Sequence, residues 1–271
     1  MLWKHRDTGT EHNFIDRVST PGKLTYVALF NGGDSLRSEA WMGMNEAGFA
    51  IMNTASYNLM PDTATYKDRE GEVMRIALGC CQTIEDFMNL LDTLPKPMGV
   101  QANFGVIDAS GKGGYFETDD FTYTPFFLND STDLIVRTNF SFTGNDSTGM
   151  GYIRYNNACH LIEEFPKGHK LTPADFTETI SRSFYHSLLK KDFLEDTSVK
   201  YAVDQDFIPR LSSSASIVIE SATTPEEYVM WTVLGYPPVS SVVPVTINDV
   251  PESVRPTEAG LRAKACNDAI K

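Results

Sequence analysis

The order of the predicted elements constrains the fold more than any other feature of this sequence. Stretches with strand character come in blocks, and stretches with helical spacing come in separate blocks between them. Strict alternation of strands and helices would indicate a parallel sheet, whereas separate blocks indicate an α+β fold with antiparallel sheets. With two pairs of helices and two blocks of strands, we predict a four-layer sandwich, with two antiparallel sheets face to face and helices outside.

The first third of the chain is predicted to be a run of antiparallel strands. Residues 14–19 alternate between apolar and polar side chains, and residues 24–30 are rich in strand-forming side chains. Residues 39–44 and 49–53 flank a tight turn in which Gly48 supplies a backbone conformation that other residues resist. These two segments are therefore predicted to form a hairpin.

Two helices are predicted to follow the hairpin. The first is indicated by apolar residues at positions i, i+3, i+4 and i+7, namely Val73, Ile76, Ala77 and Cys80. Thr83 is a predicted N-cap of the second helix, with Asp86 in the capping-box position. The Leu94-Pro95-Lys96-Pro97 run ends that helix.

The remainder is predicted to hold further strands and helices. Strands are predicted at residues 103–108, 114–118, 121–128, 134–139, 215–220, 227–234 and 242–247. Helices are predicted at residues 152–165 and 257–270. A further helix is predicted to begin at the Thr172 cap, with an apolar stripe of Phe176, Ile180, Phe184 and Leu188.

Charge and composition narrow the function classes. The chain has 271 residues with 41% apolar residues, which suffices for one sizeable core, and it has no internal repeat, so we expect one domain spanning residues 1–271. A formal net charge of −13 argues against nucleic acid as a partner and fits a protein that handles a small molecule. No apolar run is long enough for a membrane span, so no membrane partner is expected. A homo-oligomer is left open.

Metal, cofactor and conventional cysteine chemistry have little support in the sequence. The five histidines show no ligand spacing, and no phosphate-loop, dinucleotide or zinc-protease motif is present, so we expect neither a metal nor a cofactor. The four cysteines are interpreted as small apolar core residues: Cys80, Cys81, Cys159 and Cys266. The alternative that Cys80 or Cys81 is a conventional nucleophile stays open.

Polar residues recur at the ends of the predicted strands. They are Lys4, Arg6 and Asp7 at the end of a strand predicted for residues 1–7, Asn53 at the end of the second hairpin strand, Thr138 and Asn139 after residues 134–137, and Arg210 before a run of serines. Taken singly, each could simply satisfy nearby backbone groups at a strand end. Taken together, they are candidates for one site.

Several short motifs occur in an order that resembles a known family. They are Lys4-His5-Arg6-Asp7, Gly43-Met44-Asn45-Glu46-Ala47-Gly48-Phe49-Ala50, Asn53, Arg137-Thr138-Asn139 and Tyr152-Ile153-Arg154. In this order the chain, from Met1 to about Leu234, resembles the N-terminal-nucleophile (Ntn) hydrolases. The most similar family is that of acyl-coenzyme A:6-aminopenicillanic-acid acyltransferase (isopenicillin-N acyltransferase) and its amide-hydrolysing relatives. The chain also resembles, more distantly, the choloylglycine hydrolases and penicillin V acylases.

The resemblance implies a linear-amide hydrolase or acyltransferase whose mature chain, exposed by autoproteolysis, begins with a cysteine. The thiol of that cysteine is the nucleophile and its α-amino group is the base. Asp7 falls on the aspartate that orients the nucleophile, and Asn139 on the asparagine that stabilises the oxyanion. A backbone donor is expected near Asn53 and Thr54, and Arg210 is matched to an arginine near the nucleophile.

The same resemblance implies the residues that contact the substrate, and these are Lys4, Arg6, Thr54 and Tyr57. Lys4 stands where the family usually has arginine or glutamine, and His5 stands where asparagine is usual. Both of these positions depart from the family pattern.

The largest departure is the missing nucleophile, because no cysteine stands near the start of the chain. We expect it one strand and a turn upstream of Met1, so that residues 1–271 would lack the first strand, the native C-terminal end and activity. Two locations of the protein are then compatible with the sequence: the cytoplasm, or outside it after export through a leader ahead of Met1. The alternative is a degenerate member of the same fold that binds a ligand without turnover.

Overall fold

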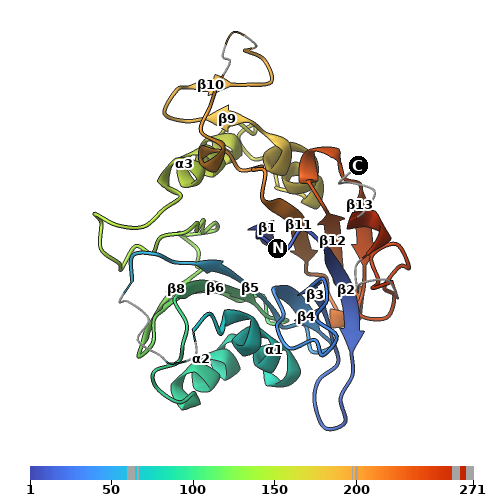
Figure 1. Ribbon diagram of the computed structural model, residues 1–271. Coiled ribbons are helices and arrows are strands. Elements are labelled where there is room, and N and C mark those ends of the chain that lie inside the picture. Colours follow the sequence, from blue (N-terminus) through green and yellow to red (C-terminus); the bar gives the residue numbers. More distant parts are fainter. Residues whose placement is uncertain (60–64, 66, 197, 199–200, 258–262, 267–271) are drawn as a thin grey trace.

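Two antiparallel sheets lie face to face with helices on their outer sides in the computed structural model (Figure 1). The structure describes residues 1–59, 65, 67–196, 198, 201–257 and 263–266. The α+β class and the four-layer order predicted from the blocks of strands and helices are confirmed.

The larger sheet has seven strands in the order β2-β3-β4-β5-β6-β7-β8, so that each strand pairs with its neighbour in sequence. The strands are β2 (Asn13–Val18), β3 (Tyr26–Asn31), β4 (Met42–Asn45), β5 (Ala50–Ala55), β6 (Ala102–Ile107), β7 (Gly113–Thr118) and β8 (Tyr123–Phe127). The predicted hairpin is β4–β5, and Gly48 in its turn has a φ of 81°.

The smaller sheet has four strands in the order β1-β11-β12-β13. They are β1 (Leu2–Asp7), β11 (Ser213–Glu220), β12 (Val229–Leu234) and β13 (Val242–Val245). β1 pairs with β11 from Leu2 opposite Ile219 to Arg6 opposite Ala215, and the register shifts between Arg6 and Asp7. Among the described strands β1 pairs with β11 alone, and its other edge is free.

Helices α1 (Glu70–Cys80) and α2 (Ile84–Thr93) cover the outer face of the larger sheet (Figure 1). The predicted capping box is present, because the Thr83 hydroxyl accepts from the Asp86 backbone N–H and the Asp86 carboxylate accepts from the Thr83 N–H. Helix α3 (Tyr152–Glu163) lies beyond the smaller sheet (Figure 1), as predicted for residues 152–165.

Short elements complete the described chain. They are the π-helical turn η1 (Asp175–Thr179), the 3-10 turns η2 (Ile180–Arg182), η3 (Asp204–Asp206), η4 (Pro225–Glu227) and η5 (Pro237–Val239), and the two-residue strands β9 (Tyr185–His186) and β10 (Lys191–Asp192). In η1, Phe176 packs on Trp3 of β1 with ring centroids 5.1 Å apart. No described helix has the length and apolar character needed to cross a membrane.

The predicted strand at residues 134–139 is wrong, because this segment pairs with no strand. Its carbonyls are bound mainly by side chains. The Thr138 carbonyl accepts from the Thr54 hydroxyl at 2.6 Å and from the Asn103 amide at 3.2 Å. The segment is therefore an extended loop held against the end of the larger sheet.

The predicted helix through Leu188 is also wrong, since helical structure ends at Arg182. Side chains compete for the helix carbonyls, and the Thr177 carbonyl accepts from both the Ser181 hydroxyl and the Arg182 guanidinium. Phe184 and Leu188 lie beyond the turn. The predicted helix at residues 257–270 falls largely outside the described residues, although 264–266 are helical.

The core lies between the sheets and under α1 and α2, and it includes Cys81 and Cys266 as predicted. The same expectation is wrong for Cys80, which ends α1 and is exposed, and Cys159 is only partly buried. Cys80 and Cys81 diverge because the backbone leaves the helix between them.

Candidate active site

A cavity of about 490 Å³ follows the free edge of β1. Every residue of β1 lines it, so both faces of this strand contribute side chains. All eight residues predicted for the site also line it: Lys4, Arg6, Asp7, Asn53, Thr54, Tyr57, Asn139 and Arg210. The fold thus brings together residues from β1, β5 and three loops, and these segments lie far apart in the sequence.

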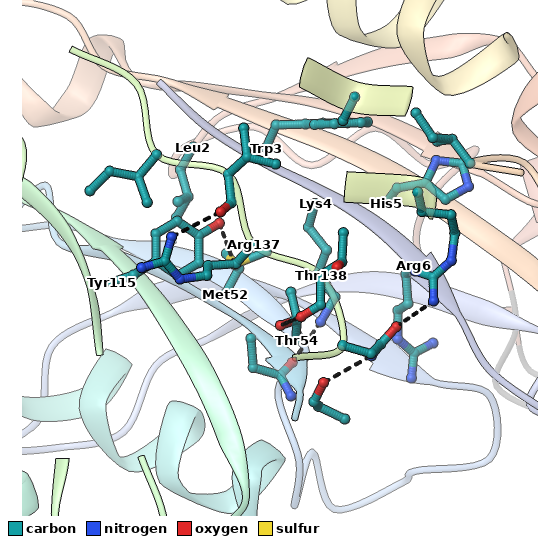
Figure 2. A pocket seen from close by; sticks show the side chains of 18 of the residues that line it. Leu2, Trp3, Lys4, His5, Arg6, Met52, Thr54, Tyr115, Arg137 and Thr138 are labelled. Atoms are coloured by element: carbon teal, nitrogen blue, oxygen red, sulfur yellow. Dashed lines mark hydrogen bonds between the residues drawn. The ribbon is translucent and has the colours of Figure 1, made fainter. Parts of the chain in front are cut away.

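Lys4 extends from β1 toward the larger sheet and is 7% exposed. Its ammonium group donates to the Asn53 side-chain oxygen at 2.6 Å and to the Trp41 carbonyl at 2.8 Å. Figure 2 shows Lys4 between the Thr54 and Arg6 side chains. Burial lowers the pKa of Lys4 well below its ordinary value, because the charged form is poorly solvated here.

Arg6 points to the same side of β1 and is 5% exposed. Its guanidinium donates to the side-chain oxygens of Asn13 at 2.5 Å and Asn31 at 2.7 Å, and it lies 5.0 Å from the centroid of the Trp41 ring. Burial lowers the pKa of Arg6 to about 10. Lys4 and Arg6 are thus two buried basic side chains whose hydrogen-bond partners are neutral.

Asp7 ends β1 at the bulge and meets the loop that leads into β11. Its carboxylate accepts from the Arg210 guanidinium and, at 2.5 Å, from the Ser213 hydroxyl. Ser213 also lies 2.8 Å from His5 Nε2. Burial acts to raise the pKa of Asp7, but nearby His5 and the bonds from Arg210 and Ser213 outweigh it and lower that pKa.

Asn139 has the geometry of an oriented amide donor. One of its N–H groups donates to the Ala55 carbonyl at 2.9 Å, and its oxygen accepts from the Arg154 guanidinium at 2.9 Å. Because an amide nitrogen carries two hydrogens and the described residues supply one acceptor, one N–H is left for a ligand in the cavity. Arg154 fixes which end of the amide is the oxygen.

The loop that carries Asn139 is anchored by a buried ion pair. Arg137 donates to the Glu117 carboxylate at 2.8 Å, and the two side chains are 4% and 0% exposed. The same carboxylate accepts from the backbone N–H groups of Phe142 and Thr143. Glu117 of β7 therefore ties the loop to the larger sheet on both sides of Asn139.

Thr54 and Tyr57 follow Asn53 along β5 and the loop after it. The Thr54 hydroxyl donates to the Thr138 carbonyl, which holds the loop next to β5 (Figure 2). Tyr57 is 52% exposed at the rim of the cavity. Thr54 is thus placed to support Asn139, whereas Tyr57 is open to a ligand.

The sequence predicts no role in the site for Arg154, Ser213, Trp41 and Asn31, although the first three lie in motifs or predicted elements. Arg154 and Ser213 contact Asn139 and Asp7 directly. Their positions depend on which loops the fold brings to the end of β1. The only local signals were the Tyr152-Ile153-Arg154 motif and the serine run after Arg210.

No cysteine thiol lines this cavity. All four cysteines belong to the described part of the chain, and none of them lines the cavity. Among the described residues there is also no group of three or more His, Cys, Asp or Glu side chains that could hold a metal ion.

His5 should make the protein sensitive to acid. Burial lowers its pKa from 6.5 to about 4, so the folded protein binds this proton less readily than the unfolded chain. The free energy of unfolding should fall as the pH drops from about 6.5 to about 4, with no contribution from His5 above that window. Urea unfolding of the wild type and of His5→Gln checks this, and equal slopes in both proteins would contradict it.

Comparison with known proteins supports the fold. No protein-family model matches the sequence, and no curated protein matches it. Among solved structures, an N-acylethanolamine-hydrolyzing acid amidase ortholog from Caenorhabditis elegans is 13% identical, with a TM-score of 0.50 over 66% of this chain and 79% of that one. A mutant conjugated bile acid hydrolase from Clostridium perfringens is 10% identical, with a TM-score of 0.51 over 92% and 89%.

Penicillin V acylase from Agrobacterium tumefaciens is 16% identical, with a TM-score of 0.49 over 92% of this chain and 82% of that one. The similarity to the amidase ortholog and to the bile acid hydrolase, together with the two facing antiparallel sheets, defines the fold as that of the Ntn hydrolases. The narrower resemblance to isopenicillin-N acyltransferases stays a prediction.

Proposed function

We propose that this protein is an amide hydrolase or acyltransferase that acts on a linear amide through an N-terminal cysteine carried by a segment ahead of Met1. The observation that carries the proposal is the convergence of Asp7, Asn53, Asn139 and Arg210 on one cavity. These residues come from separate parts of the chain, and in a fold of this class their meeting favours a reaction site over four unrelated strand ends.

The position of the cavity supports an upstream nucleophile. It runs along the free edge of β1, where a further strand could pair with the backbone. The cavity contains a candidate oxyanion donor and a carboxylate but no thiol. A cysteine on a strand beside β1 would supply the missing group.

The proposed reaction begins when the cysteine thiol attacks the amide carbonyl and its own α-amino group takes the thiol proton. The carbonyl oxygen becomes an oxyanion, which accepts a hydrogen bond from the unused N–H of Asn139. The C–N bond then breaks, the amine leaves with the proton, and a thioester remains on the cysteine. Water or a second amine attacks that thioester, releasing the acid or the transferred amide and restoring the thiol.

In this proposal Asp7 orients the nucleophile, and it is a positioning residue. The bonds from Arg210 and Ser213 keep its carboxylate fixed and ionised. Arg154 has a matching role toward Asn139, since it holds the amide oxygen away from the oxyanion. Autoproteolysis ahead of the cysteine would expose the amino group that serves as base.

The test is to express the protein with the residues encoded upstream of Met1 and to follow amine release from a panel of N-acyl amides. We expect turnover by the extended protein, and loss of it when the upstream cysteine is replaced by alanine. Residues 1–271 alone serve as the inactive control. If no Cys, Ser or Thr is encoded in frame within a strand's distance, or the extended protein is inactive, the proposal is wrong.

A ligand-binding protein without turnover is the second candidate, favoured by the absence of a thiol from the cavity. It predicts that the protein at its native length binds N-acyl amides but releases no amine. The same panel, read by calorimetry as well as by amine release, separates the two candidates.

A further inference from the structure

Two cysteines adjoin each other at the end of α1, and neither of them lines the cavity. Neighbouring side chains in a continuous helix do not face each other. Here the backbone changes from helical at Cys80 to extended at Cys81, where φ is −85° and ψ is 139°. The two sulfur atoms lie 3.9 Å apart. The pair therefore forms a cluster of two thiols that is separate from the proposed reaction site.

The two thiols differ in their access to solvent. Cys80 is exposed, whereas Cys81 is 1% exposed and belongs to the hydrophobic core. A dissolved reagent can therefore reach Cys80 directly, and it can act on Cys81 only through Cys80. A solvent-accessible thiol next to a second thiol is the arrangement of redox-sensing cysteines, in which the second thiol resolves the first product.

The surroundings of Cys80 favour its thiolate, which is the nucleophilic form of a cysteine. A hydrogen bond from the Cys81 thiol lowers the pKa of Cys80 to about 7, and Lys23 adds to this effect while partial burial opposes it. The turn that carries Lys23 is fixed beside α1, because the Leu24 N–H donates to the Gly79 carbonyl at 3.0 Å. The same hydrogen bond, together with burial, raises the pKa of Cys81. Cys80 is therefore the thiol that reacts first.

A bond between these two sulfurs would be labile rather than structural. The Cα atoms of adjacent residues are about 3.8 Å apart, whereas those of ordinary disulfides are about 4.4–6.8 Å apart. The loop closed by such a bond would contain no other residue, so the bond would remove little entropy from the unfolded chain. Strained and exposed disulfides are the easily reduced ones, which suit a reversible modification.

We propose that Cys80 and Cys81 form a reversible redox site whose oxidant is a low-molecular-weight disulfide. The Cys80 thiolate attacks one sulfur of that disulfide, so that a mixed disulfide forms on Cys80 and one small thiol is released. The Cys81 thiol then loses its proton and attacks the Cys80 sulfur, the Cys80–Cys81 bond forms, and the second small thiol leaves. In total the two protein thiols lose two electrons and two protons, and the small disulfide becomes two thiols.

Formation of the Cys80–Cys81 bond should weaken the core locally. The backbone of Cys81 is held on both sides, because its N–H donates to the Ala77 carbonyl and its carbonyl accepts from the Asn45 side chain, each at 2.8 Å. The sulfurs must approach from 3.9 Å to about 2.05 Å. With the backbone held, the Cys81 side chain has to rotate away from the core, and the space that it leaves destabilises the protein.

The test is to incubate the folded 271-residue chain with glutathione disulfide, quench it in acid, alkylate the remaining thiols in denaturant and analyse tryptic peptides by mass spectrometry. Residues 76–112 form one tryptic peptide, which contains Cys80 and Cys81 and no other cysteine. We expect this peptide to escape alkylation and to be about 2 Da lighter than its dithiol form, and reduced glutathione should restore both thiols. A stable glutathione adduct on Cys80, two unmodified thiols, or a bond that reduced glutathione leaves intact would overturn the proposal.

Three variants assign the order of the steps. Cys81→Ala should stop at the glutathione adduct on Cys80, whereas Cys80→Ala should leave Cys81 unmodified, because no reagent reaches it directly. Cys159→Ala, which removes a partly buried thiol elsewhere, is the matched control and should form the bond as the wild type does. A glutathione adduct on Cys81 in Cys80→Ala would overturn the assignment of Cys80 as the thiol that reacts first.

Urea unfolding measures the effect on the core. The oxidised wild type should unfold at a lower urea concentration than the reduced wild type, whereas treatment of Cys80→Ala with glutathione disulfide should leave its midpoint unchanged. Equal midpoints for the oxidised and reduced wild type would overturn the proposed movement of Cys81 out of the core.

Discussion

Replacing Asn139 by leucine in the protein with its upstream nucleophile is expected to lower kcat about 100- to 1,000-fold, because loss of one oxyanion donor costs roughly 3–4 kcal/mol of transition-state stabilisation. Substrate affinity should change little, since the N–H acts on a charge that develops only during the reaction. Steady-state kinetics of amine release, with binding measured separately, checks this expectation.

Asn129→Leu is the matched control, because Asn129 is an exposed asparagine outside the cavity. Its kcat should equal that of the wild type. If Asn139→Leu also keeps wild-type kcat, Asn139 is not the oxyanion donor, and the second N–H described above has another use.

Replacing Glu117 by alanine is expected to destabilise the protein by about 3–5 kcal/mol, because Arg137 would then be a buried charge without its partner. Four hydrogen bonds to this carboxylate would also be lost, from Arg137, the two backbone N–H groups and the Thr143 hydroxyl. The loop that holds Asn139 would lose its anchor to β7. Urea unfolding followed by circular dichroism measures the change.

Glu72→Ala is the control for Glu117→Ala. Glu72 also accepts a hydrogen bond from an arginine, Arg69, at 2.8 Å, but the two side chains are 38% and 28% exposed. An exposed pair of this kind contributes at most about 1 kcal/mol. Similar losses in both variants would show that burial of the Arg137–Glu117 pair has no special importance.

Local signals in the sequence predicted local structure well. The β4–β5 turn needed a positive φ, which Gly48 supplies, and the α2 start needed a capping box, which Thr83 and Asp86 supply. The order of strand and helix blocks was enough to predict the layers. Each of these features depends on a few neighbouring residues or on coarse patterning.

The errors lie where tertiary contacts override that pattern. Residues 134–139 were predicted to form a strand, but the apolar residues 134–136 line the cavity and the Thr138 carbonyl accepts hydrogen bonds from Thr54 and Asn103. The helix predicted after Thr172 ends earlier than expected, because the side chains of Ser181 and Arg182 donate to the Thr177 carbonyl. Neither competition is visible in the local sequence.

The candidate site shows the same contrast between residues that local motifs predict and residues that only contacts across the fold bring in. Asp7 and Asn139 could be placed from ordered motifs, and both line the cavity together with Arg210. Arg154 and Trp41 belong to the site through contacts across the fold, and no spacing rule relates them to Asp7.

The most direct test of the account is intact-mass spectrometry of the protein with its upstream segment, quenched in acid during turnover of an N-acyl amide. We predict an added mass equal to the acyl group, carried by the upstream cysteine and abolished by its replacement with alanine. A protein that releases amine without any acylated species, or that carries the acyl group on Cys80 or Cys81, would contradict the proposed N-terminal nucleophile.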